Sequence, residues 1–166
     1  MAHLKEVDKL TLYRRFGYQT TDFYEGWYLY SEQLGLEAGL APDPYDELGI
    51  LQSEIFRAVR LVVDTGLHYK KWTREEAIDY MKAKTGMSDT ECRVEIERYI
   101  VWPGQALSYK VGMIKILELR EKAMDALGDR FNIKDFHSAV LDNGNPPLFI
   151  VEKMVDEMIA KGLEAS

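Results

Sequence analysis

The sequence predicts an all-α fold of about seven helices joined by short loops, and three observations support this. Apolar residues recur at the three- and four-residue spacing of amphipathic helices. Proline and glycine mark breaks between these segments, and two capping boxes mark helix starts. Alternating patterns typical of strands are nearly absent. We therefore expect residues 1–166 to form a single helical domain.

The first two helices are expected at residues 21–40 and 44–67. In the first, Phe23, Trp27, Tyr30 and Leu34 form a stripe that should face the core. The break at 41–44 contains Pro42 and Pro44, and Asp43 is positioned to cap the second helix. This second helix is apolar on nearly all faces and is therefore expected to be buried.

The remaining helices follow from local signals. Thr73 with Glu76 and Ser88 with Glu91 have capping-box spacing, and Gly86 separates the two helices that they begin. A break at Trp102-Pro103 precedes a long helix that ends near residue 127. Two last helices are expected over residues 134–141 and 147–162.

Composition excludes several classes of protein. The chain has 166 residues, 46% of them hydrophobic and 30% charged, as in ordinary globular proteins. Its net charge of -7 and the lack of a basic run argue against nucleic acid as a partner. No apolar run is long enough to span a membrane, so the chain as given is expected to be cytoplasmic. The single cysteine, Cys92, is interpreted as a packed helix residue.

The clearest pattern for chemistry is a charged stripe on the second helix. Arg57, Arg60, Asp64 and His68 follow one another on one face of an otherwise apolar segment. One interpretation is a clamp, in which an arginine holds a substrate carboxylate while Asp64 orients His68 for proton transfer. The alternative is an internal ladder of i, i+4 pairs.

Three other side chains are candidates. Glu25 lies in an aromatic run, where a metal ion would compensate a desolvated carboxylate, although a solvated or ion-paired glutamate is the simpler alternative. Gln105 and Tyr109 are one turn apart after the Trp102-Pro103 break. The Tyr109 hydroxyl is suited to stabilising an oxyanion, but a core tyrosine with one hydrogen bond explains it equally.

Four ordered motifs resemble one family. They are FYEGWYLYSE from Phe23, RLVVDTGLH from Arg60, WPGQALSYKVG from Trp102, and FHSAVLDNG from Phe136 with Pro147-Leu148 after it. Over residues 14–155 the chain resembles the carboxyl-terminal part of the bacterial domain-of-unknown-function family 885, whose members are large, helical and zinc-metallopeptidase-like. One departure is Tyr28, at a position where family members often carry alanine.

The resemblance implies roles for the candidates. In the family an upstream H-E-x-x-P-G-H motif is expected to supply two zinc ligands and a general base, with Glu25 as third ligand. Arg57, Arg60, Asp64 and Gln105 would bind a peptide-like substrate, and His68 and Tyr109 would assist proton transfer or stabilise an oxyanion.

The chain itself has no H-E-x-x-H motif. We therefore expect it to bind no zinc and to be inactive alone, as a truncated or split substrate-side half of a hydrolase. Its expected partner is a complementary amino-terminal half. The rival interpretations are an interaction module that forms homo-oligomers through the surface near Tyr24, Trp27 and Tyr28, and a domain that binds a small carboxylate ligand.

Overall fold

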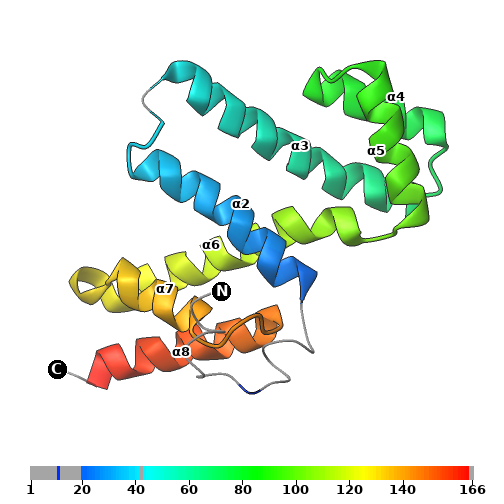
Figure 1. Cartoon of the computed structure of the whole chain (residues 1–166). Coiled ribbons are helices and arrows are strands. Elements are labelled where there is room, and N and C mark those ends of the chain that lie inside the picture. Colours follow the sequence, from blue (N-terminus) through cyan, green and yellow to red (C-terminus); the bar gives the residue numbers. More distant parts are fainter. Residues whose placement is uncertain (1–10, 12–19, 42, 165–166) are drawn as a thin grey trace. The chain divides into compact units, whose positions relative to one another are not determined.

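The computed structural model describes residues 11, 20–41 and 43–164, and within them it contains helices and no strand (Figure 1). This confirms the all-α fold. The described part contains seven α-helices, and two short 3-10 turns, η2 (Gln105–Leu107) and η3 (Gly128–Arg130), lie at the two ends of one of them. The helices are α2 (Thr21–Glu37), α3 (Pro44–His68), α4 (Arg74–Thr85), α5 (Asp89–Val101), α6 (Ser108–Leu127), α7 (Ile133–Leu141) and α8 (Leu148–Glu164).

Three helices begin at the capping residues that the sequence predicts. Asp43 accepts a hydrogen bond from the Tyr45 backbone as the cap of α3. Thr73 and Ser88 begin α4 and α5 with complete capping boxes, in which each cap satisfies backbone N–H groups that have no partner within the helix. Of the expected break at 41–44, Pro42 lies outside the described residues.

Two helix ends differ from the expected bounds. The first helix ends at Glu37, three residues before Leu40, and Gly39 then takes a left-handed conformation that favours glycine. After Pro103 the chain forms the 3-10 turn η2 before α6 begins at Ser108. In both places a glycine with positive φ, Gly39 or Gly104, sets the boundary.

The chain divides into two compact units, which we describe separately: residues 28–111, and residues 1–27 with 112–166. The expected single domain over residues 1–166 stays a prediction. In the unit of residues 28–111, α4 and α5 pack on each other and on α3. Its core is built of apolar side chains from these three helices and η2. They include Val59, Val63, Ile78, Met81, Cys92, Ile96, Tyr99 and Ala106.

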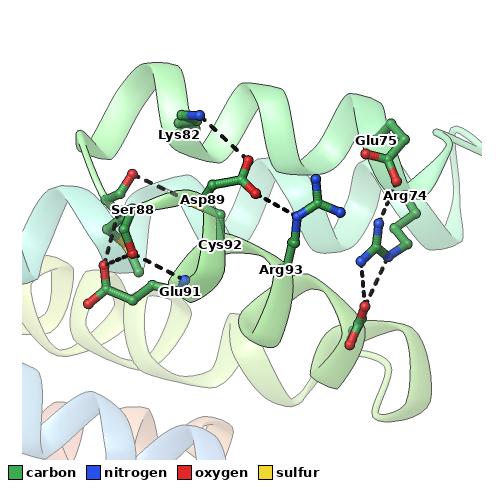
Figure 2. A network of polar contacts seen from close by, with 10 residues as sticks. Arg74, Glu75, Lys82, Ser88, Asp89, Glu91, Cys92 and Arg93 are labelled. Carbon is green, nitrogen blue, oxygen red and sulfur yellow. Dashed lines mark hydrogen bonds and ion pairs between the residues drawn. The ribbon is translucent and has the colours of Figure 1, made fainter.

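Cys92 is fully buried in this core, as its interpretation as a packed helix residue requires. Ion pairs on the surface join α4 to α5 (Figure 2). Asp89 on α5 accepts from Lys82 on α4 at 3.5 Å and from Arg93 at 2.6 Å. Arg74 on α4 pairs with Glu97 on α5 at 2.5 Å. Solvent screens such exposed pairs, so the apolar core carries most of the stability.

The other unit, as far as it is described, combines the start of α2 with most of α6 and with α7 and α8. Its buried side chains include Phe23, Ile116, Phe136, Val151 and Val155. α2 and α6 approach so closely that a Cβ on Gly112 would lie 1.9 Å from the Asp22 carbonyl oxygen and 2.7 Å from the Gly26 Cα. Two glycines from separate sequence motifs therefore form one helix contact.

The expected burial of α3 is confirmed only in part. Val59, Val63 and Gly66 are buried, but Ile55 and Val62 are exposed, against the expectation of an all-round apolar core helix. In the stripe of α2, Phe23 and Tyr30 are buried while Trp27 and Leu34 are half-buried. Among the described helices, none combines the length and apolar character needed to cross a membrane.

Candidate functional site

The charged stripe of α3 turns toward α5 and the turn that precedes α6, all within the unit of residues 28–111. Arg60 and Asp64 are buried, Arg57 is half-buried, and His68 is exposed at the end of the helix. The apolar residues Val59 and Val63, which pack against α4 and α5, fix this orientation because they lie beside the stripe on the same helix.

Arg60 is held by a polar network on α5. Its Nε donates to the Tyr99 hydroxyl at 2.8 Å, and its Nη2 donates to Glu95 Oε2 at 3.1 Å. Glu95 Oε2 also accepts from the Tyr99 hydroxyl at 2.6 Å and from Arg98 Nη2 at 2.9 Å. One carboxylate oxygen thus receives three donors and compensates two guanidinium groups.

The network shifts the titration of its members. Burial disfavours the charged form of Glu95, but hydrogen bonds from Tyr99 and Arg98 and the nearby charge of Arg60 outweigh it, so the Glu95 pKa lies below its ordinary value. Burial is the main reason why the pKa of Tyr99 is strongly raised. Tyr99 therefore stays protonated and able to donate at physiological pH.

Asp64 fixes the turn before α6. Both of its carboxylate oxygens accept from the Gly104 backbone N–H at 3.2 Å, and Gly104 has a left-handed φ of 80°. Burial raises the pKa of Asp64 above its ordinary value, although the Gly104 hydrogen bond and the charges of His68 and Arg98 oppose this rise. His68 Nε2 lies 3.0 Å from the Tyr99 carbonyl oxygen, to which it can donate.

The hydrogen bonds of Arg60 and Asp64 run to segments outside α3. Arg60 bonds to Glu95 on α5 and Asp64 bonds to Gly104, so the stripe is tied to neighbouring segments and not into a ladder along α3. Asp64 accepts from the Gly104 N–H and His68 Nε2 lies against the Tyr99 carbonyl oxygen, and the roles of Asp64 and His68 in a clamp stay predictions.

Gln105 and Tyr109 contact the same cluster. Gln105 Oε1 accepts from Arg98 Nη1 at 2.8 Å. The ring centre of Tyr109 lies 5.5 Å from the Arg57 guanidinium carbon and 5.0 Å from that of Arg60. Phe56 faces the same two groups at 5.2 Å and 4.2 Å. Two arginines are therefore stacked against the same two aromatic rings, an arrangement stabilised by cation–π attraction.

Two N–H groups of this arginine pair lack acceptors. Arg57 Nε and Arg60 Nη1 are buried and have no hydrogen-bond partner in the described structure. Of the neighbouring charges, Arg60 and Arg98 share the Glu95 carboxylate, and Asp64 interacts with Arg98 and His68. Since buried donors are nearly always paired, this arginine pair is suited to receive an anionic acceptor.

Glu25 lies in the other unit and is half-buried on α2. Within residues 20–41 and 43–164, no three His, Cys, Asp or Glu side chains form a group able to hold a metal ion. Catalytic zinc requires three protein ligands, and the resemblance places two of them upstream of the residues that this chain matches. We therefore derive no chemical step through a metal. The role of Glu25 as a third ligand stays a prediction.

Tyr24 and Tyr28 are 57% and 54% exposed on α2, and their role in an interaction surface stays a prediction. Trp27, between them in sequence, instead stacks edge-on against His137 at 5.4 Å. Sequence reasoning missed Glu95 and Phe56. The i, i+4 spacing of Glu95 and Tyr99 is the signal that would have drawn attention to the first.

Comparison with known proteins gives a family. The profile of a family described as "Bacterial protein of unknown function (DUF885)" matches residues 1–155. A crystal structure of a candidate lipoprotein from Colwellia psychrerythraea is 53% identical, with a TM-score of 0.83 over 85% of this chain and 24% of that one. A candidate lipoprotein of unknown function from Shewanella oneidensis shares the fold at 24% identity, with a TM-score of 0.84 over 92% of this chain and 28% of that one. The chain thus spans about a quarter of the length of these two structures, and no curated protein matches it.

Proposed function

Because the chain belongs to the DUF885 family, we propose that it forms the helical, substrate-side part of a metallopeptidase-like hydrolase, in which Arg57 and Arg60 hold the carboxylate of a peptide-like substrate. The observation that carries the proposal is the pair of buried N–H groups without acceptors, Arg57 Nε and Arg60 Nη1. A carboxylate supplies two acceptor oxygens whose negative charge strengthens hydrogen bonds from guanidinium groups.

On this proposal the two arginines have different tasks. Arg60 is fixed by Glu95 and Tyr99, so it is a rigid donor whose loss would also disturb the core. Arg57 is half-buried, and its Nη1 donates to the Ser53 carbonyl at the long distance of 3.5 Å, so it is held more weakly than Arg60. Entry of a ligand requires the half-buried ring of Tyr109 to move, because it lies over both guanidinium groups.

On this proposal the chain binds the substrate carboxylate and does not by itself hold the zinc ion. Zinc, the general base and two zinc ligands belong to the part of the family fold that the resemblance places upstream. The chain by itself is then expected to bind peptide-like carboxylates without hydrolysing them. A cytoplasmic location stays a prediction, and the description of the Colwellia relative as a candidate lipoprotein favours the cell envelope as the site of action for longer members.

The test is calorimetric titration of the chain with N-acetyl-dialanine and with its carboxy-terminal amide. The acid is expected to bind at least tenfold more tightly than the amide, since a charge-assisted hydrogen bond contributes about 1.5–3 kcal/mol. Arg57→Gln should remove this preference. Arg93→Gln is the matched control, because Arg93 is an exposed arginine on α5 whose partner is Asp89. Equal affinity for acid and amide, or equal behaviour of the two variants, would refute the proposal.

A further inference from the structure

A small hollow lies on the same side of α3 as the arginine pair. Its volume is about 220 Å³, and it is lined by residues of α3, the end of α4 and the loop after it, namely Gly49, Gln52, Ser53, Phe56, Thr85 and Met87. At roughly 100° per residue, Ser53, Phe56 and Arg60 follow one another within about 60° of the same direction around the helix. We call this space the α3 hollow.

Two residues connect the α3 hollow directly to the arginine pair. The Phe56 ring centre lies 4.2 Å from the Arg60 guanidinium carbon and 5.2 Å from that of Arg57. The Ser53 carbonyl oxygen accepts from Arg57 Nη1 at 3.5 Å. Ser53 lies one helical turn, about 6 Å along the axis, before Arg57. An extended residue spans about 3.5 Å before its side chain is counted, so a residue whose carboxylate meets the arginine pair can place its side chain in the α3 hollow.

The lining of the α3 hollow favours an apolar side chain. None of the six lining residues carries a charge. The Thr85 hydroxyl donates to the Met81 carbonyl oxygen at 2.8 Å and accepts from the Met87 N–H at 3.3 Å. Ser53 Oγ donates to Glu32 at 3.2 Å. Because these hydroxyl groups already have partners, a polar or charged side chain would lose hydration there without gaining a strong hydrogen bond.

Phe56 and Met87 form the apolar part of the lining. Both are half-buried and pack against the core of this unit, so their positions are set by the fold. The volume exceeds the roughly 150 Å³ of an engineered cavity in another protein that admits benzene. A side chain up to the size of phenylalanine therefore fits, and the flexible thioether of Met87 can adapt to different apolar shapes.

We propose that the α3 hollow selects the side chain of the carboxy-terminal residue of the substrate, and that this residue is apolar, such as leucine or phenylalanine. The inference rests on the carboxylate binding proposed above, because the arginine pair is what places the carboxy-terminal residue beside the hollow. The peptide then binds with its terminal carboxylate at Arg57 and Arg60 and with its last side chain against Phe56 and Met87.

The test is calorimetric titration of the chain with N-acetyl-alanyl dipeptide acids that end in glycine, leucine, phenylalanine, lysine or aspartate. The leucine and phenylalanine acids are expected to bind at least about tenfold more tightly than the glycine acid, since burial of two methylene groups is sufficient for that factor. The lysine and aspartate acids should bind no more tightly than the glycine acid. The amide of each compound is measured beside its acid, so that carboxylate binding is determined separately.

Gly49→Leu fills the α3 hollow from the protein side. A Cβ on Gly49 meets nothing within 4 Å, so the added side chain can enter the hollow without displacing backbone atoms. In this variant the leucine and glycine acids should bind equally. Gly35→Leu is the matched control, because Gly35 also lies inside a helix with nothing within 4 Å of its added Cβ but does not line the hollow. It should keep the preference for leucine.

The outcomes separate this inference from the proposed function. If acids bind more tightly than amides while the leucine and phenylalanine acids gain nothing over the glycine acid, carboxylate binding stands and selection by the hollow is overturned. Tightest binding of the lysine or aspartate acid, or equal behaviour of Gly49→Leu and Gly35→Leu, overturns it as well. If no acid binds more tightly than its amide, the proposed function fails and this inference fails with it.

Discussion

Replacing Gly112 by alanine tests the packing of α2 on α6. The added Cβ would lie 1.9 Å from the Asp22 carbonyl oxygen and 2.7 Å from the Gly26 Cα, where ordinary contacts are 3.4–4 Å. Both neighbours are backbone atoms that cannot rotate away, so the helices must separate by more than an ångström. Overpacking of this kind costs about 3 kcal/mol, and the higher helix propensity of alanine returns about 1 kcal/mol.

The net loss of about 2 kcal/mol corresponds to a melting temperature lower by about 4–8 °C for a chain of this size. Gly49→Ala is the matched control, because Gly49 also lies inside a helix but nothing lies within 4 Å of its added Cβ. That control should gain up to about 1 kcal/mol from propensity alone. Thermal unfolding followed by circular dichroism gives both values. If Gly112→Ala is as stable as Gly49→Ala, the proposed close contact of the two helices is wrong.

Two further predictions concern the network around Arg60. Tyr99→Phe should cost about 1–3 kcal/mol in urea unfolding, because it leaves Arg60 Nε buried without its acceptor; a loss below about 0.5 kcal/mol would contradict this. Glu95→Gln tests pH dependence. The folded pKa of Glu95 is lowered, so its contribution is complete above its unfolded pKa of about 4.3 and is lost as the pH falls through the folded pKa. The stability difference between wild type and Glu95→Gln should therefore shrink between pH 5 and pH 3, and a constant difference would disagree with the network.

The sequence was sufficient for the fold class and for most helix starts, because these depend on neighbouring residues. The caps Asp43, Thr73 and Ser88 each act within three residues, and all three are confirmed. The ends of helices were less predictable. Gly39 ends its helix early through a left-handed conformation that the local pattern does not specify.

Contacts between distant segments were not predictable in the same way. The stripe on α3 was visible as a spacing, but the acceptor of Arg60, Glu95, is 35 residues away and the donor to Asp64, the Gly104 N–H, is 40 residues away. The sequence likewise contains no local sign that Ile55 and Val62 are exposed, since apolar residues on all faces usually indicate burial. The surroundings of Arg57, Arg60 and Tyr109 are likewise built by segments distant in the sequence, so the local pattern does not specify them.

The arginine side chains themselves allow the most direct measurement of carboxylate binding. Nuclear magnetic resonance of the Arg57 Nε–H group, titrated with N-acetyl-dialanine and with its amide, reports on a donor that is buried without an acceptor in this structure. The account predicts a saturable downfield shift of the Arg57 Nε–H proton with the acid, and none with the amide. An Arg57 signal that stays unchanged at saturating acid, or that moves equally with both compounds, would contradict it.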